Sequence, residues 1–513
     1  MGKRSKQSTG KVYLVGAGPG DPELITVKGL HYLKSADVIV HDRLLDIRLL
    51  VHASRDAEVI DVGKKPYNTG GNSQSDINNL LLEKARTGKN VVRLKGGDPF
   101  IFGRGAEEAA ALAEAGVPFE IVSGVTSAIA AATYAGIPLS HRGTASSITF
   151  VTGSEAVCKK SVAWDALARS KGTLVILMGW KNLPKITETL IQEGYSADTP
   201  IALIQWGTQP YQRTVTGVLS NIVIEARRMN LSPPILAVIG EVVNLRKKLR
   251  WFDNRPLSGI RVLVTRSLTR AGTLSKMLSQ KGAFPIEVPT IEIQALGDYT
   301  ELDSALRDLS KYDWVVFPST NAIEIVMDRL SILNADARAF GSVQVAAIGS
   351  ASDDTLRSRG IIADFIPDEY VSESVAEGLK QRINPGQRVF LPQSDIGRNM
   401  LSESLAKHGV DVHRVTTYHT VPPKDSSSLK THFANGVDVI TFTSSSTARN
   451  LVALMDGDLS PLYGIKIACI GPITAQAAIE AGLKVDILAT EYTVEGLVKA
   501  LENHFDKEPR SNG

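Results

Sequence analysis

The chain has little cysteine, no long hydrophobic run and almost no net charge. Only Cys158 and Cys469 occur among its 513 residues, and they lie far apart. This spacing excludes a disulfide framework or a cysteine zinc site and is typical of a reducing cytoplasm. No apolar run approaches the roughly 20 residues that span a bilayer. The net charge of +3 gives no reason to expect nucleic acid or a membrane surface as a partner.

The length of the chain and its alternating pattern indicate several α/β domains. Short apolar segments alternate with helical stretches from end to end, and 43% of the residues are hydrophobic. The charged, proline-containing segment 246–258 precedes a new strand and is predicted to be a linker. We expect a domain on each side of it, over 11–245 and 259–503. Residues 1–10 and 504–513 are expected to be disordered tails, and no signal peptide is expected.

The second half contains an internal duplication. GIRVLVTRS from Gly259 matches GQRVFLPQS from Gly386, and DWVVFPSTNA from Asp313 matches DVITFTSSST from Asp438. Further segments also match, and the offset between matched segments stays between 122 and 127 residues. The repeat predicts two similar α/β lobes with a cleft between them.

Glycine-rich loops follow two strand-like runs of the first half. VVRLKGGDPFIFGRGAEE covers 91–108, and GAGPG covers 16–20. Paired glycines let the backbone approach a ligand closely, and in α/β sheets ligands bind at the carboxyl ends of strands. Residues 16–20, with Asp42 at the distance of a ribose-binding acid, partly match a dinucleotide fingerprint. Asp21 stands where the last glycine would be, so a nicotinamide-linked oxidoreductase remains an alternative.

Seven motifs of the first half occur in a specific order: GAGPGDPELITVKG, HDRL, VGKK, RLKGGDPFIFGRGAEE, VSGVTSA, GIPLSHRG and LMG. With them, residues 11–245 resemble the S-adenosylmethionine-dependent uroporphyrinogen-III C-methyltransferases. The resemblance implies two unlike α/β lobes that hold the methyl donor and the substrate in their cleft, usually in a homodimer. The sulfonium of the donor is its own electrophile, so no metal is expected.

The resemblance also implies roles for single residues. Asp42 would be the base that accepts a proton during methylation, and Lys64 would donate a proton or bind a substrate carboxylate. For Asp42 the alternative is a structural pair with Arg43, and for Met178 it is plain core packing. The implied contacts of S-adenosylmethionine are Pro19, Gly96, Gly97, Asp98, Ile101, Thr126, Ser127, Met178 and Gly207.

Basic residues gather in these loops, although the chain is nearly neutral. The substrate of the family carries eight carboxylates, which cations at a cleft would attract. Each cation could equally be a solvated surface charge, so none is singled out as essential. The residues concerned are Lys64, Lys65, Arg93, Lys95, Arg104, His141 and Arg142.

The second half, with VTRS, TSSSTARN, IGPITAQAA and EYTVEGLV, resembles uroporphyrinogen-III synthase over 258–503. The resemblance implies a chain that crosses between lobes, one built from both ends of this half and the other from its middle. Tyr418 would assist departure of the substrate hydroxyl, the alternative being a strand tyrosine packed at the lobe hinge. Gln393 stands where the family often has arginine, and Arg398 could supply the cation.

Each copy of the repeat also places hydroxyl side chains after a strand, over 318–321 and 443–446. Helix amino termini with such groups suit carboxylates, although ordinary N-capping explains most of them singly.

Together, these patterns predict a cytoplasmic, bifunctional enzyme of small-molecule tetrapyrrole biosynthesis. It would close hydroxymethylbilane to uroporphyrinogen III and methylate this twice to precorrin-2, towards siroheme or cobalamin. A separate dehydrogenase and chelatase would complete siroheme. The alternative is a methyltransferase whose second half is degenerate or is a ligand-binding sensor.

Overall fold

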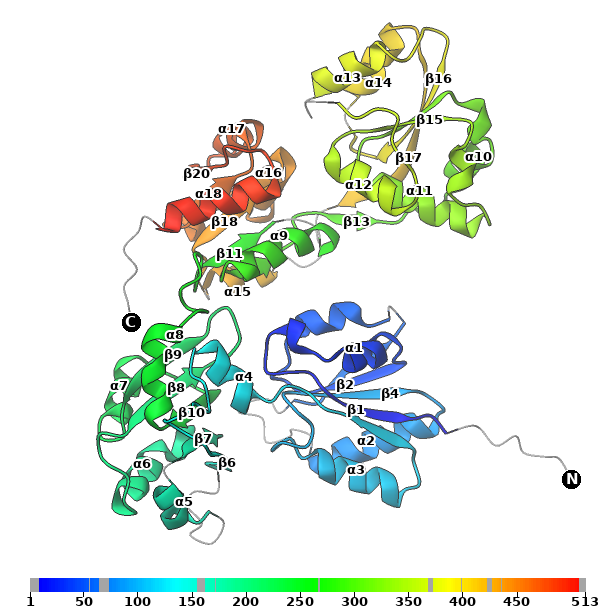
Figure 1. The fold of residues 1–513 in the computed structure, drawn as a ribbon. Coiled ribbons are helices and arrows are strands. Elements are labelled where there is room, and N and C mark those ends of the chain that lie inside the picture. Colours follow the sequence, from blue (N-terminus) through cyan, green and yellow to red (C-terminus); the bar gives the residue numbers. More distant parts are fainter. Residues whose placement is uncertain are drawn as a thin grey trace, which may run out of the picture. The chain divides into compact units, whose positions relative to one another are not determined.

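The computed structural model contains four five-stranded sheets (Figure 1). Two lie in each half of the chain, and helices alternate with strands, which confirms the predicted α/β class. No helix within the described ranges is long and apolar enough to cross a bilayer. The structure describes residues 9–54, 56–63, 73–154, 162–170, 172–265, 268–367, 372–397, 399–421, 427–434 and 436–506.

The first sheet is wholly parallel, in the order β3-β2-β4-β1-β5. Its strands are β1 Val12–Gly16, β2 Val38–His41, β3 Glu58–Asp61, β4 Val91–Lys95 and β5 Phe119–Val122. The helices that accompany it are α1 Val27–Lys34, α2 Gln74–Arg86, α3 Gly105–Glu114 and α4 Ser127–Tyr134.

Helices cover both faces of this sheet, because its central strands bury side chains alternately on each side. On one face, Val91 and Leu14 pack with Leu81 of α2 and Leu112 of α3. On the other face, Leu94 and its neighbours pack with residues of α1. Alternation along β4 places Arg93 and Lys95 on the α2 and α3 side.

The second sheet is mixed, in the order β6-β7-β10-β8-β9. Only β6 and β7 pair in parallel, and the remaining neighbours are antiparallel. Its strands are β6 Ile148–Thr152, β7 Thr173–Leu177, β8 Pro200–Gln205, β9 Arg213–Val218 and β10 Ile235–Ile239. Its helices are α5 Trp164–Ser170, α6 Leu183–Gln192, α7 Ile222–Arg228 and α8 Arg246–Leu249. The two lobes of the first half are therefore unlike, as the resemblance implies.

Helix α4 joins these two lobes. It follows β5 of the first sheet, yet Ala128, Ala131 and Ala132 on it pack against Val175 and Val238 of the second sheet. The small alanine side chains allow the helix to lie close to the strands. The loop at the start of α4 is thereby fixed to both lobes.

The predicted linker is folded against the far end of the same helix. The Trp251 indole N–H donates to the Thr133 carbonyl at 3.1 Å, and Arg246 donates to the Ala135 carbonyl and to Asp253. The Tyr134 ring packs edge-on against Trp251, with ring centres 5.2 Å apart. Residues 246–253 are thus an ordered extension of the first half.

The third sheet has the order β12-β11-β18-β19-β20, and the fourth has β13-β17-β16-β14-β15. The third contains β11 Arg261–Val264, β12 Phe284–Glu287, β18 Val439–Phe442, β19 Lys466–Cys469 and β20 Ile487–Leu488. The fourth contains β13 Glu292–Gln294, β14 Trp314–Phe317, β15 Gln344–Ala347, β16 Arg388–Ser394 and β17 Asp411–Val421.

In this strand order the chain crosses between the two sheets of the second half. The third sheet takes strands from both ends of the second half, which Figure 1 shows as a mixture of green and orange ribbons, and the fourth takes strands from the middle. Each copy of the repeat contributes strands to both sheets: β11 and β12 match β16 and β17, and β14 and β15 match β18 and β19.

The helices of the second half fall into two groups in the same way. With the third sheet go α9 Leu268–Gln280, α15 Ser427–Ala434, α16 Ser445–Leu454, α17 Pro472–Glu480 and α18 Val494–Asp506. With the fourth go α10 Thr300–Arg307, α11 Thr320–Ile332, α12 Ser350–Ser358, α13 Ser372–Lys380 and α14 Met400–Lys407. By backbone contacts the chain divides into two compact units, one within 1–262, 275–285 and 498–513 and the other within 263–274 and 286–497.

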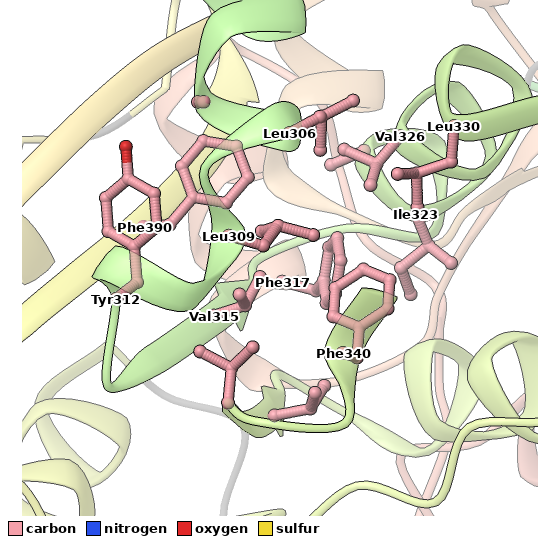
Figure 2. Packing of buried hydrophobic residues seen from close by; sticks show 14 of the residues in the cluster. Leu306, Leu309, Tyr312, Val315, Phe317, Ile323, Val326, Leu330, Phe340 and Phe390 are labelled. Atoms are coloured by element: carbon pink, nitrogen blue, oxygen red, sulfur yellow. The ribbon is translucent and has the colours of Figure 1, made fainter. Parts of the chain in front are cut away.

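One core of the fourth sheet combines aromatic side chains with a larger number of aliphatic ones (Figure 2). Phe317 of β14 lies against Phe340, with ring centres 6.1 Å apart, and Phe390 of β16 lies against Tyr312 at 5.3 Å. Such pairs add to the stabilisation that burial of their area provides. Tyr418 of β17 belongs to the same core.

Candidate functional site

A cavity of about 680 Å³ lies in the first half, bordered by both of its lobes. Its volume is in the range of small-molecule binding sites. From the first lobe it is lined by the glycine loops and by Asp42, and from the second by Met178, Trp206 and Gly207. It lies at the carboxyl ends of the parallel strands, where α/β sheets bind ligands.

Three glycines hold the first lobe's wall of the cavity together. Gly16 ends β1, Gly97 follows β4 and Gly124 follows β5. A Cβ built on Gly124 would lie 2.3 Å from the Gly97 carbonyl oxygen and 2.7 Å from the Gly16 Cα. Only glycine permits this approach, since real Cβ contacts are longer than 3 Å. Gly97 also exchanges two backbone hydrogen bonds with Gly18, at 2.7 and 3.3 Å, so both predicted glycine loops meet here.

Asp98 stabilises this wall. Its carboxylate accepts hydrogen bonds from the Phe100 amide at 2.8 Å and from the Gly124 amide at 3.0 Å. The two bonds tie the loop after β4 to the loop after β5. Asp98 therefore has a structural role even without a bound ligand. Its predicted contact with the methyl donor stays a prediction.

Most residues assigned to donor binding lie at the cavity. Asp42, the predicted base, lies there as well. Thr126 instead caps α4, where it accepts a bond from the Ala128 amide, and Ile101 is 41% exposed beside the cavity loop. Lys64 lies outside the described residues. The predicted donor contacts that line the cavity are Pro19, Gly96, Gly97, Ser127, Met178 and Gly207.

Met178 is not a core residue, so the packing alternative for it is wrong. Its side chain is 53% exposed, and its backbone adopts a φ of 54°. Phe102, Arg104 and Trp206 also line the cavity with positive φ values. Left-handed backbone is uncommon in residues with a side chain and gathers at ligand sites. Sequence reasoning could not find this feature, because no residue type signals it.

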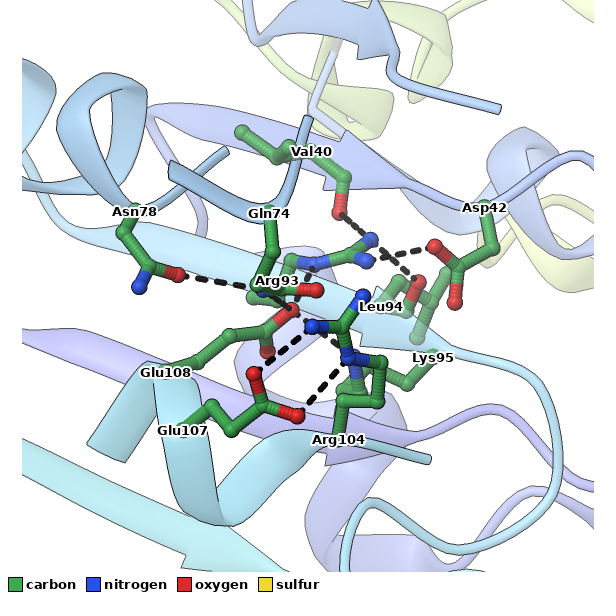
Figure 3. A network of polar contacts seen from close by, with 10 residues as sticks. All are labelled: Val40, Asp42, Gln74, Asn78, Arg93, Leu94, Lys95, Arg104, Glu107 and Glu108. Atoms are coloured by element: carbon green, nitrogen blue, oxygen red, sulfur yellow. Dashed lines mark hydrogen bonds and ion pairs between the residues drawn. The ribbon is translucent and has the colours of Figure 1, made fainter. Parts of the chain in front are cut away.

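Four charged side chains form a continuous network beside the cavity (Figure 3). Glu108 on α3 is fully buried and accepts bonds from Lys95 Nζ at 2.8 Å and from Arg93 Nε at 3.2 Å. The other edge of the Arg93 guanidinium pairs with Asp42. Burial and the neighbouring Arg93 cation lower the pKa of Lys95, while Glu108 opposes this. Arg93 and Lys95 are thus buried partners of carboxylates and not solvated charges.

Other predicted cations lie differently. Arg104 lines the cavity and pairs with Glu107 at 2.7 Å, both being half-exposed. His141 and Arg142 are exposed. Arg104 is therefore a cation of the cavity rim that is within reach of an anionic ligand. Lys65, like Lys64, is outside the described residues.

In the second half, Tyr418 is buried and its hydroxyl lies 3.0 Å from the Ser319 hydroxyl. Ser319 caps α11 and accepts the Ala322 amide at 3.2 Å. The pair joins β17 to the start of a helix. In the other lobe the matching Ser444 contacts Ser446 at 3.0 Å and makes no side-chain cap bond, so the two lobes differ here.

Gln393 has a cation beside it. With its amide oxygen turned towards Arg414, it accepts two bonds from that guanidinium, at 2.6 and 2.7 Å. Arg398, the residue predicted to supply a cation, lies outside the described residues.

Two family models match the chain in tandem. Residues 11–223 match the tetrapyrrole (corrin/porphyrin) methylases, and residues 272–499 match uroporphyrinogen-III synthase HemD. The porphyrin biosynthesis protein HemD of Ruminiclostridium josui is 37% identical over 96% of this chain and 97% of its own length. The chain belongs to this family of two-part porphyrin biosynthesis proteins. It is an enzyme with an N-terminal uroporphyrinogen-III C-methyltransferase half and a C-terminal uroporphyrinogen-III synthase half.

The methyltransferase half has more similar single-domain relatives. The uroporphyrinogen-III C-methyltransferase of Priestia megaterium is 53% identical over 46% of this chain and 99% of its own length. A solved uroporphyrin-III C-methyl transferase from Thermus thermophilus, complexed with S-adenyl homocysteine, is 41% identical over 46% of this chain and all of its own, with a TM-score of 0.40.

The glycine junction leads to a test of the fold. Replacing Gly124 by Ala puts a methyl group against backbone that cannot move aside, so we expect a loss of about 1–3 kcal/mol and a lower melting temperature. Gly96→Ala is the matched control from the same wall, because a Cβ there meets nothing within 4 Å. Thermal unfolding of both full-length variants checks this. Equal melting temperatures would show that the close approach at Gly124 does not limit the stability of the fold.

Proposed function

We propose that the synthase half closes hydroxymethylbilane to uroporphyrinogen III, with inversion of the last pyrrole. The methyltransferase half then methylates this product twice with S-adenosylmethionine to give precorrin-2. The observation that carries the proposal is the tandem match to a methylase and a synthase in one chain, since the product of one is the substrate of the other. The cavity and its residues support the methylation step.

The wall residues fit a donor with an adenosine and an amino-acid end. Gly96 is exposed, and a Cβ on it would meet no protein atom, so its side-chain position opens onto free space at the cavity. The cavity is also lined by Pro19, Gly97 and Ser127 from the first lobe and by Met178 and Gly207 from the second. When bound, the donor supplies an electrophilic methyl group on its sulfonium. Alignment of methyl, sulfur and ring carbon by these walls provides most of the rate.

The chain itself supplies the proton acceptor. Methylation of a ring carbon requires loss of a proton elsewhere in the macrocycle. Asp42 lines the cavity and would accept this proton. Arg93 holds Asp42 at one oxygen. Arg104 at the rim would pair with a carboxylate of the substrate.

In the synthase half, Tyr418 would assist departure of the hydroxyl as water, leaving a carbon electrophile that the last pyrrole attacks. Its hydroxyl lies at the start of α11 beside Ser319, where the helix dipole favours negative charge.

We also propose a homodimer through the methyltransferase half, a cytoplasmic location, and a separate dehydrogenase and chelatase acting on the product. The scarcity of cysteine supports the location.

The test of this function is incubation of the full chain with hydroxymethylbilane, with and without S-adenosylmethionine. We expect uroporphyrinogen III without the donor and a doubly methylated product with it, identified by mass and isomer analysis. Only the spontaneously closed, uninverted isomer would show that the synthase half is a non-catalytic module.

The donor wall is tested by Gly96→Ala. The added methyl group would occupy space that the donor needs, and overpacking of about 1–3 kcal/mol corresponds to roughly 5- to 150-fold weaker binding. Calorimetry with S-adenosylhomocysteine measures this. Gly297→Ala, at another open and exposed glycine, is the control and should bind as the unaltered chain does. Unchanged affinity in Gly96→Ala would place the donor elsewhere.

The synthase role of Tyr418 is tested by Tyr418→Phe. We expect ring closure to slow by about 10²-fold with methylation of supplied uroporphyrinogen III unaffected. Tyr312→Phe is the matched control, a buried tyrosine of the same core whose hydroxyl bonds His413. If both variants close the ring at the normal rate, Tyr418 is a structural residue only.

A further inference from the structure

Glu108 has no role in the proposed chemistry, yet it is the most completely buried charged residue of the network in Figure 3. One of its oxygens, Oε1, accepts bonds from Lys95 Nζ at 2.8 Å, Arg93 Nε at 3.2 Å and Gln74 Nε2 at 3.3 Å. A carboxylate withdrawn from water in this way is retained only where cations and donors compensate it. Its partners all come from β4 and α2.

The geometry follows from two periodicities. Arg93 and Lys95 are two residues apart on β4, so both point to the same face of the sheet. Glu108 lies in the first turns of α3, which packs on that face. The helix amino terminus favours a carboxylate there. Without Glu108, the two buried cations at the cavity wall would keep one carboxylate nearby, Asp42, which pairs with Arg93.

Arg93 connects Glu108 to Asp42 at the cavity. Its Nε is bonded to Glu108, its Nη2 to Asp42, and its Nη1 to the carbonyls of Val40 and Leu94, both at 3.4 Å. The guanidinium is planar and is held on every edge, so it cannot rotate without breaking several bonds. Asp42 follows β2, the neighbour of β4, and its side chain is 35% exposed at the cavity.

We propose that Glu108 is a positioning residue for methyl transfer: through Arg93, it fixes the direction in which the Asp42 carboxylate faces the substrate. Charge balance supports this, because Arg93 and Lys95 together offset Glu108 and Asp42. Burial and the Arg93 cation lower the pKa of Lys95, and Glu108 opposes this lowering. The inference rests on the proposed role of Asp42 as the base.

The experiment is a double-mutant cycle in the full chain, with uroporphyrinogen III and S-adenosylmethionine supplied. Glu108→Gln keeps the shape of the side chain and removes its charge. We expect kcat for methyl transfer to fall about 10- to 100-fold, because misplacement of a reacting group is costly, with KM changed less than about 3-fold. In an Asp42→Asn background, Glu108→Gln should lower kcat by less than about 2-fold, since it acts through Asp42.

The outcomes separate the inference from the proposed function. If Asp42→Asn methylates at the normal rate, the base assignment fails, and the inference with it. If Asp42→Asn is slow but Glu108→Gln is normal, or if the two losses multiply, then Glu108 does not act through Asp42 and the inference alone is overturned.

Two further variants control for folding. Glu120 on β5 is likewise bonded by two lysines, Lys11 and Lys28. Glu120→Gln removes this carboxylate and should leave kcat unchanged. If Glu108→Gln does not fold, Arg93→Lys replaces it, because lysine keeps the charge but cannot bridge both carboxylates. It should show the same loss of kcat and the same dependence on Asp42, and a normal kcat would overturn the inference.

Discussion

The close approach of backbone at Gly16, Gly97 and Gly124 is the constraint on which the methyltransferase half depends. These residues stand at the ends of three adjacent strands, and their missing side chains let the strand ends converge. Asp98 then ties two of the loops together through backbone amides. At the glycine loops, the wall of the cavity therefore exposes backbone.

Another part of the cavity wall is formed by charged side chains instead of backbone. Behind the end of β4, the buried charges of Arg93, Lys95 and Glu108 hold Asp42 at the edge of the cavity. Such a network contributes little net stability, since burying ions costs about as much as pairing them returns. In the proposed mechanism, the network directs Asp42, because a carboxylate held at one oxygen presents the other oxygen to the substrate. The glycine loops and the charged network thus border one cavity.

The synthase half shows how duplication can yield interdependent lobes. Each copy of the repeat supplies strands to both sheets, so neither copy can form a lobe by itself. The lobes have also diverged at matching positions. Ser319 caps its helix and contacts Tyr418, whereas the equivalent Ser444 contacts Ser446. Chemistry in this half is therefore expected to be asymmetric.

The sequence by itself determined the α/β class, the repeat and the glycine loops, because glycine and strand periodicity are local requirements. The lobe crossing was implied by the family resemblance alone. The sequence also located the cavity through Pro19, Gly96 and Asp42. Only the tertiary structure showed Arg93 and Lys95 to be buried partners of Glu108, and Met178 to be exposed in a left-handed conformation. Burial and pairing arise when α3 packs over β4, and no residue type signals a left-handed backbone at a residue with a side chain. Neither is encoded within a single segment of the chain.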